Sequence, residues 1–308
     1  MSRGIVGLGR ESAVAVNTLE YVDISSTGNA TDFGDATLAR ESSAVCSSST
    51  RGLWAAGYTG SNSNVIDYVT IATTGNATDF GDTTAAKRAV CGFSNETRGL
   101  ISSGFTTVNI NVIEYVTIAT TGNATDFGDT TQARRVPGGC SSTTRGLTAG
   151  GETTVLVNTI DQVEIATAAN ATDFGDLTVS RDGSGGASSN TRAVFGGGSW
   201  TSYLNTIDYV TIASAGNATD FGDLIAGMYA PGATSNGTRG IWAAGDTSGG
   251  NIDSIDYAEI ASAGNTSDFG NLTAARQSPN CVSDSHGGIE AAAASTPGPR
   301  NLLTLGCG

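Results

Sequence analysis

The chain is short of charge, and of positive charge above all. Its 308 residues hold 15 Lys and Arg against 29 Asp and Glu, a formal net charge of −14, and only 14% of residues are charged. Lysine occurs once, as Lys87, and no basic cluster is present. Because nucleic-acid binding depends on grouped cations that meet the phosphates, we expect no nucleic-acid partner.

Histidine and long apolar runs are also scarce. His286 is the one histidine, so a His-based zinc site or His-driven acid–base catalysis lacks its usual residues. No run of about 20 apolar residues occurs, which argues against membrane insertion. The first four residues lack the charged-then-apolar pattern of a secretory signal, so we expect no Sec export. We likewise expect no bound metal and no cofactor.

Glycine, threonine, serine and asparagine dominate what is present, while long runs of good helix formers are missing. Glycine contributes 43 residues and proline only 5. Glycine-rich turns between β-branched residues are typical of many short strands. The composition therefore predicts an all-β protein.

Three motifs recur along the chain. A Thr/Ser-Asp-Phe-Gly motif occurs six times, at intervals of 47, 47, 47, 47 and 48 residues. Its Asp residues are Asp32, Asp79, Asp126, Asp173, Asp220 and Asp268, and its Phe residues are Phe33, Phe80, Phe127, Phe174, Phe221 and Phe269. A mostly Thr-Arg-Gly motif contributes Arg3, Arg51, Arg98, Arg145, Arg192 and Arg239. An Ile-Asp-Tyr-Val-Thr-Ile motif contributes Tyr21, Tyr68, Tyr115, Tyr209 and Tyr257, with Gln162 in place of the ring in the fourth copy.

Each period contains four strand-like runs, which we name a to d. In the second copy they cover residues 44–46, 52–55, 65–72 and 78–84. Four strands in 40–50 residues is the period of a propeller blade. The chain opens at strand b and repeats strand a at residues 279–282, so the last strand should complete the first blade. The sequence predicts a six-bladed β-propeller with four antiparallel strands per blade and the small residues of strand a innermost.

The order of these motifs resembles the kelch repeat. An apolar strand ending in Gly-Gly (residues 194–197) precedes a tyrosine-bearing strand (residues 207–209), then Phe221. Ala-Arg endings follow strand d in the first and last copies. The resemblance covers residues 3–285 and implies a kelch-like propeller in which Phe replaces the usual Trp. Residues 286–308 then form a C-terminal extension.

We expect the recurring residues to be structural. The Phe residues should fill the outer core of each blade, and Asp and Thr side chains should cap turn amides. Each motif Arg should bridge to a turn or an Asp of its own blade or the next. The alternative for Asp32 with Asp35, and for the equivalent pairs, is cation binding. The five cysteines, an odd number, should be reduced and largely buried.

The loops divide into two faces. Loops a–b and c–d share one face, which is nearly identical in every repeat and is called the uniform face. Loops b–c and d–a share the opposite face, which differs from blade to blade and is called the variable face. Because recognition is carried by loops on rigid scaffolds, the variable face is the candidate contact surface, with neutral drift as the alternative. Its candidate residues are Tyr58, Phe105, Arg134, Arg135, Trp200, Tyr203, Met228 and Tyr229.

No catalytic constellation stands out from the repeat, so we expect no enzyme. Repeated Asn-Ala-Thr-Asp-Phe-Gly-Asp arrays resemble those of predicted virion structural proteins from marine tailed bacteriophages, especially cyanophages. This resemblance implies a tail fibre, tip or baseplate-associated propeller, assembled in a bacterial cytoplasm and located in the virion. Its partners would be other virion proteins, through the variable face or residues 287–308, or a host-surface glycan. A carbohydrate-binding propeller and a six-bladed glycosidase remain as alternatives.

Overall fold

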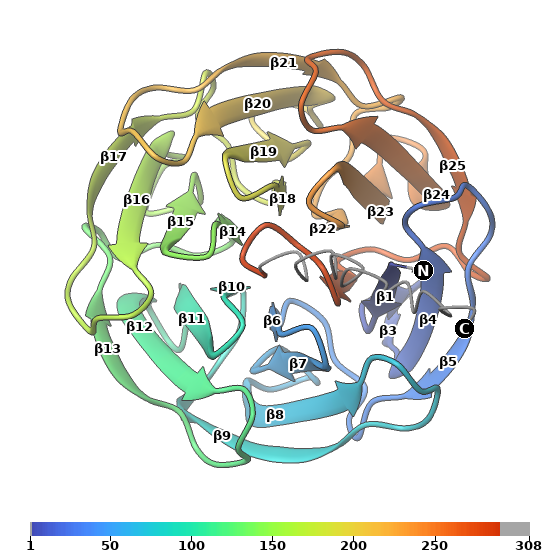
Figure 1. Cartoon of the computed structure of the whole chain (residues 1–308), viewed down its shortest axis with the longest axis horizontal. Helices are drawn as coiled ribbons and strands as arrows, with labels where there is room; N and C mark the ends of the chain where they lie inside the picture. The colour runs from blue at the N-terminus through green and yellow to red at the C-terminus, as the bar shows by residue number, and fades with distance from the viewer. Residues whose placement is uncertain (1, 290–308) are drawn as a thin grey trace, which may run out of the picture.

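Six four-stranded antiparallel sheets are arranged around one axis (Figure 1). This computed structural model describes residues 2–289, which contain no helix and therefore none that could cross a membrane. The sheets are the blades of a six-bladed β-propeller, which confirms the predicted fold class and blade count. We number the blades 1 to 6 from the N-terminus.

The innermost strand of every blade is strand a, as predicted. It is β26 (Asn280–Ser283) in blade 1, and in blades 2 to 6 it is β6 (Ala44–Ser47), β10 (Cys91–Ser94), β14 (Gly138–Ser141), β18 (Gly185–Ser188) and β22 (Gly232–Ser235). Small residues are needed here because the strands of neighbouring blades approach closely. A Cβ atom added to Gly139 would lie 2.7 Å from the carbonyl oxygen of Gly92.

Strands b and c follow outward in each blade. Strand b is β1 (Arg3–Gly7), β7 (Arg51–Ala55), β11 (Arg98–Phe105), β15 (Arg145–Ala149), β19 (Arg192–Gly196) and β23 (Arg239–Thr247). Strand c is β4 (Thr18–Asp23), β8 (Ser63–Thr70), β12 (Asn109–Thr117), β16 (Thr159–Glu164), β20 (Thr206–Thr211) and β24 (Gly250–Glu259).

Strand d is the outer edge of each blade. It is β5 (Thr31–Asp35), β9 (Thr78–Lys87), β13 (Thr125–Asp129), β17 (Thr172–Asp176), β21 (Thr219–Asp223) and β25 (Ser267–Asn271). A two-stranded ribbon of β2 (Arg10–Glu11) and β3 (Val14–Ala15) extends the b–c connection of blade 1. The ribbon was not predicted, because runs this short carry no alternation of apolar and polar residues.

The ring is closed by the two ends of the described chain. Strand β26 pairs with β1 in antiparallel register, Gly4 opposite Ser283 and Gly7 opposite Asn280. Beyond the strands, the carboxylate of Asp284 accepts hydrogen bonds of 3.1 Å from the backbone N–H of Arg3. The half-blade offset of the repeat predicted that the last strand would complete the first blade, and the pairing of β26 with β1 confirms it.

The hydrophobic core lies between neighbouring sheets. At the boundary of blades 1 and 2, Ile5, Leu19, Phe33, Trp54 and Val69 form one buried cluster. The motif Phe residues are 2–3% exposed, as expected for an outer blade core, and five of them meet a tyrosine of strand c edge to face. The core therefore links each blade to its neighbour.

The Gly-Asn-Ala turn between strands c and d joins each blade to the preceding one. Gly75 and Ala77 of blade 2 donate backbone hydrogen bonds of 2.8 and 2.7 Å to the carbonyls of Phe33 and Asp35 in blade 1. The side-chain oxygen of Asn76 accepts the N–H of Asp35 at 3.1 Å. The expected capping by the first Asp of the motif is wrong, because Asp32 is exposed and its side chain makes no hydrogen bond within residues 2–289. The cap is the asparagine of the next blade.

Candidate functional site

The variable face has a regular backbone rim. In every blade connection, one residue of the d–a loop forms an isolated antiparallel bridge with a residue at the end of strand b or just beyond it. The six pairs are Gln277 with Arg10, Glu41 with Tyr58, Arg88 with Phe105, Arg135 with Glu152, Asp182 with Ser199, and Tyr229 with Asp246. The backbone geometry is therefore constant while the side chains differ, which is the combination that a recognition surface requires.

The d–a loops surround a cavity of about 410 Å³ at the centre of this face. Glu41, Tyr58, Arg88 and Tyr229 of the rim contribute to its lining. Three of the chain's five prolines, Pro137, Pro231 and Pro279, also stand in its wall, which stiffens the opening. The volume is within the usual range for small-molecule sites.

An alternation of aromatic rings and arginines runs along one arc of the rim. The Arg88 guanidinium lies 4.6 Å from the ring centroid of Tyr58 and 4.9 Å from that of Phe105. Arg135 lies 5.6 Å from the Phe105 centroid and binds one Glu152 oxygen through Nε and Nη2, at 2.9 and 2.7 Å. These contacts fix long side chains that would otherwise lose entropy on binding.

Two tyrosines and two aspartates occupy the opposite arc. The rings of Tyr203 and Tyr229 stack with centroids 6.1 Å apart. Tyr203 donates its hydroxyl to Asp246 at 2.7 Å, and Tyr229 donates to Asp182 at 3.4 Å. Burial, together with the negative charge of Glu152, raises the pKa of the Asp182 carboxyl to about 6. Burial and the charge of Asp182 likewise raise the pKa of Tyr229.

Exposed apolar side chains gather in the loops of the variable face. The large hydrophobic residues exposed within residues 2–289 are Val14, Val108, Val155, Trp200 and Ile225. The first four lie in b–c connections and Ile225 lies in a d–a connection. Because isolated apolar residues scatter over the whole surface of an ordinary protein, their restriction to one face indicates a contact surface.

Side chains tie the b–c loops of this face to one another. Asn62 donates to the backbone oxygens of Phe105 and Thr106 in the next blade, at 3.3 and 2.7 Å. Asn109 repeats this contact with Glu152 and Thr153 at 3.0 and 2.6 Å. The loops are consequently held in place relative to each other, and binding would require little further ordering.

Two of the eight predicted contact residues are not on this surface. Arg134 is fully buried, and its guanidinium lies 2.8 Å from Asp161 of the next blade. Met228 is 1% exposed and packs in the core between blades 5 and 6. Their prediction as contact residues is wrong because they occupy the last inward-facing position before the rim, one residue ahead of Arg135 and Tyr229. Tyr58, Phe105, Arg135, Trp200, Tyr203 and Tyr229 do lie on the variable face.

Sequence reasoning missed the buried ion pairs to which Arg134 belongs. A cation that ends one blade meets an acid on strand c of the next, and the pairs are Arg40–Asp67, Lys87–Glu114, Arg134–Asp161, Arg181–Asp208 and Arg276–Glu20. The signal was available, because the first four pairs are each separated by 27 residues. Blade 6 is the exception, since its acid Asp256 is buried and Met228 stands at the place of the cation.

The motif arginines lie on the uniform face and join adjacent blades. Arg51 lies over the ring of Tyr68 in its own blade, 4.6 Å from the centroid, and donates to the carbonyl of Ile118 in the next blade at 3.0 Å. Arg3, Arg98, Arg145, Arg192 and Arg239 bond to carbonyls 67 or 68 positions ahead, or across the ring closure to Ile24. These are the bridges to a turn of the next blade that we expected.

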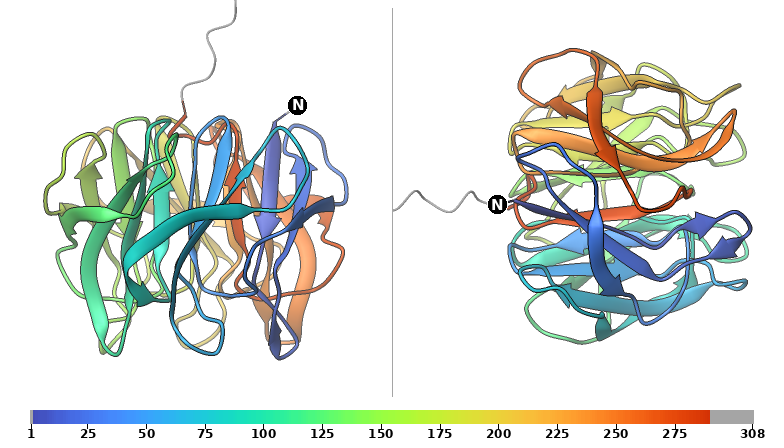
Figure 2. Two further views of the ribbon diagram at one scale, coloured as in Figure 1. Left: turned by 90° about the horizontal axis from the view of Figure 1, so that it is seen from below. Right: turned by 90° about the vertical axis from the view of Figure 1, so that its right-hand side faces the viewer.

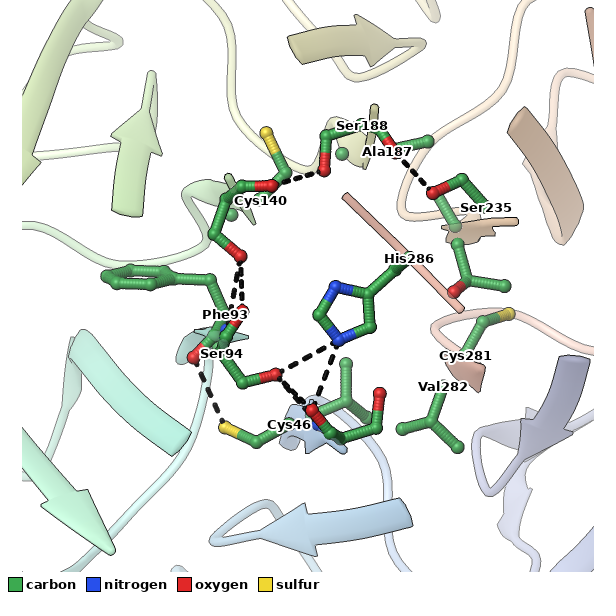
Figure 3. A pocket seen from close by; sticks show the side chains of 18 residues that line it. Cys46, Phe93, Ser94, Cys140, Ala187, Ser188, Ser235, Cys281, Val282 and His286 are labelled. Atoms are coloured by element: carbon green, nitrogen blue, oxygen red, sulfur yellow. Dashed lines mark hydrogen bonds between the residues drawn. The ribbon is translucent and has the colours of Figure 1, made fainter. Parts of the chain in front are cut away.

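The axial channel is narrowed at the uniform face by a ring of serines and by His286. Six serines at the ends of the strand a segments form a ring in which each hydroxyl donates to the carbonyl of the preceding serine, at 2.6 to 2.9 Å. His286 projects into this ring, with Nε2 3.2 Å from the carbonyl oxygen of Ser47 and 3.2 Å from the Ser94 hydroxyl (Figure 3). The central cavity lies at the opposite end of the axis, among the d–a loops of the variable face. Figure 2 shows the two loop faces edge-on.

The cysteines around this channel are not site candidates. Cys46, Cys91, Cys140 and Cys281 are free and buried, as predicted. Burial raises the pKa of the Cys91 thiol to about 11, which opposes formation of a reactive thiolate. Cys307 lies outside the described residues. Within residues 2–289, no group of three or more His, Cys, Asp or Glu side chains is arranged to hold a metal ion.

Comparison of the chain with protein-family models and with curated protein sequences produced no match. The functional interpretation therefore depends on the repeated motifs and on the geometry of the two faces.

Proposed function

We propose that the chain is a non-enzymatic structural propeller of a bacteriophage virion, associated with the tail, whose variable face contacts other virion proteins or the host surface. Two resemblances support this proposal: the repeat order is similar to kelch repeats, and the repeated turn motif is similar to that of virion proteins from marine tailed phages. The observation that carries it is the restriction of exposed Val14, Val108, Val155, Trp200 and Ile225 to loops of the variable face.

The arrangement of side chains on the variable face favours a role in protein assembly over catalysis. A constant rim of backbone bridges presents side chains of every type, namely basic, acidic, aromatic and apolar. Interfaces of proteins draw their binding energy from a few aromatic and arginine residues in a rigid setting. Arg88, Arg135, Tyr203 and Tyr229 are held in such a setting by stacking and hydrogen bonds. Residues 287–308, the other proposed contact, lie largely outside the described part of the chain.

The location is tested by immunogold electron microscopy of tailed particles, collected from a lysate in which the gene is expressed in its native context. We expect label on the tail. Label confined to cell debris would contradict a virion role.

The contact surface is tested by charged substitutions on each face. Val155→Asp combined with Trp200→Asp should prevent incorporation of the chain into particles, because the charges must be desolvated at an interface. Thr74→Asp is the matched control, since Thr74 is exposed in the c–d turn of the uniform face. Equal incorporation of both variants would show that the variable face is not used.

A carbohydrate-binding propeller is the second candidate. Trp200 is 58% exposed beside Tyr203, whose ring stacks on Tyr229, and flat aromatic faces are common platforms for sugars. A glycan array separates the two proposals. Retention that is lost on Trp200→Ala supports sugar binding, and an array without any retention counts against it.

A further inference from the structure

Five blades share a stack of three side chains on the uniform face. In blades 1, 2, 3, 5 and 6 the motif arginine lies over the tyrosine of strand c, with the guanidinium carbon 4.3 to 4.7 Å from the ring centroid. The same tyrosine meets the motif phenylalanine edge to face, with centroids 5.8 to 6.2 Å apart. The repeat therefore builds the same aromatic position five times.

Blade 4 lacks the ring but keeps the rest of the stack. Gln162 stands at the tyrosine position, opposite Leu147 on strand b as Tyr209 is opposite Val194 in blade 5. Arg145 keeps its hydrogen bond to the carbonyl of the next blade, 2.7 Å from Ile212, so its guanidinium is positioned without a ring beneath it. Phe174 remains buried, at 2% exposure.

An open cavity of about 380 Å³ lies in the surface of blade 4, beside the position of the missing ring. It is lined by Arg145, Gln162, Val163, Glu164, Thr167, Ala169, Asn170 and Thr172, and the Glu164 carboxylate lies 3.5 Å from Nε of Arg145. The Gln162 Oε1 atom is buried and has no hydrogen-bond partner within the described residues, while Nε2 is 3.5 Å from the Asp173 carbonyl. A buried amide oxygen without a donor is costly, so this wall is incomplete as it stands.

We propose that this cavity binds a phenol ring, and that its natural occupant is a tyrosine side chain exposed on a partner protein. The five other blades show what fits beneath the arginine, and a ring entering from outside would restore the cation–π contact with Arg145. The polar side chains of Glu164 and Asn170 also line the cavity and can bond the hydroxyl of a tyrosine, which favours tyrosine over phenylalanine. This site lies on the uniform face, so it adds a second contact to the proposed function and does not depend on it.

The test uses the purified full chain and 4-fluorophenol, a small mimic of the tyrosine side chain, followed by ¹⁹F NMR. The native chain should broaden and shift the fluorine signal in a saturable way. Gln162→Tyr should lose at least tenfold in affinity, because the protein's own ring fills the site as it does in five blades. This variant should remain folded, since its sequence then matches the repeat.

The matched control creates the same vacancy elsewhere. Tyr209→Gln should open an equivalent cavity beneath Arg192 in blade 5, and a chain carrying both Gln162→Tyr and Tyr209→Gln should bind the probe again. Tyr115→Gln in blade 3 serves the same purpose if Tyr209→Gln fails to fold. Absence of saturable binding to the native chain, or binding unchanged by Gln162→Tyr, would overturn the proposal. Either result leaves the test of virion location unaffected.

Discussion

At the scale of single residues, the buried acids on strand c decide how adjacent blades are held. Asp208 is fully buried and meets Arg181 at 2.8 Å, whereas Asp256 is 1% exposed and faces no cation among residues 2–289. Asp256 instead accepts hydrogen bonds from the Ile225 backbone and the Thr266 hydroxyl, at 2.9 and 3.1 Å. Burial raises the pKa of Asp256 above its ordinary value.

This difference predicts unequal costs for the same substitution. Asp208→Asn should destabilise the protein by about 3–5 kcal/mol, because it leaves the Arg181 charge buried without a partner. Asp256→Asn should cost less than about 1 kcal/mol, because the amide oxygen can still accept both hydrogen bonds. Urea denaturation at pH 7 measures both free energies of unfolding, and equal costs would contradict the argument.

A second prediction concerns Asp182 at the mouth of the central cavity. Its pKa in the folded chain is about 6, above the ordinary 3.8, so between these values the folded protein holds a proton that the unfolded chain has released. The free energy of unfolding should therefore fall as the pH rises from 4 to 6.5, by up to about 3 kcal/mol. Asp182→Asn should flatten this dependence in urea denaturation series. An unchanged pH profile would show that the carboxyl is not protonated in the fold.

The sequence predicted residues of the exposed rim correctly, but it did not separate them from the buried residues directly beneath the rim. Tyr58, Trp200 and Tyr203 were identified because they interrupt a repeated pattern. Met228 interrupts it in the same way and yet is buried, while Arg134 is buried because it belongs to the recurring cations that end each blade. Neighbouring loop residues can point in opposite directions, inward to the core or outward to solvent. A core residue such as Arg134 therefore stands directly before a surface residue such as Arg135.

At the scale of elements, strand d of each blade packs in close backbone contact with the c–d turn of the next blade. Gly175 on β17 has a φ of 148°, and a Cβ atom there would lie 2.4 Å from the carbonyl oxygen of Gly216. Gly216 itself has nothing within 4 Å of an added Cβ. The two glycines face each other across one interface, but only the first is required by the packing.

We therefore predict that Gly175→Ala costs at least about 2 kcal/mol of stability, through steric overlap with backbone and an unfavourable φ. Gly216→Ala is the control on the other side of the same contact and should change stability by less than about 0.5 kcal/mol. Thermal unfolding followed by circular dichroism checks both. Similar melting temperatures for the two variants would refute the close approach.

Element prediction succeeded where the repeat supplied several copies to compare. The four strands of blade 2 were placed within a few residues, although β9 runs on to Lys87, beyond the predicted end at position 84. The capping residue was assigned to the wrong side chain. Both Asp32 and Asn29 recur in every copy with turn-forming chemistry, and the sequence does not show that the turn pairs with the preceding blade.

At the scale of the whole molecule, the phase of the repeat was sufficient to predict closure. The repeat includes an extra copy of strand a at residues 279–282, and this strand, β26, pairs with β1 in blade 1. The central cavity was not predictable, because its size depends on how far the d–a loops lean toward the axis. The Gln162 cavity was marked in the sequence by its missing ring, but its partnerless amide oxygen appears only in the structure.

The serine ring gives a direct measure of how strong the closure is. Ser235 donates to the carbonyl of Ser188 at 2.6 Å within the continuous part of the ring, and Ser283 donates to the carbonyl of Ser235 at 2.7 Å on the strand that completes blade 1. If the seam is as firmly formed as the other interfaces, each lost hydrogen bond removes the same free energy.

Ser235→Ala and Ser283→Ala should then each cost about 1–2 kcal/mol and differ by less than about 0.5 kcal/mol. Urea denaturation measures both, with Ser214→Ala, an exposed serine outside the ring, as control. A Ser283→Ala variant that unfolds like the native chain while Ser235→Ala does not would mean that the seam opens before the rest of the propeller.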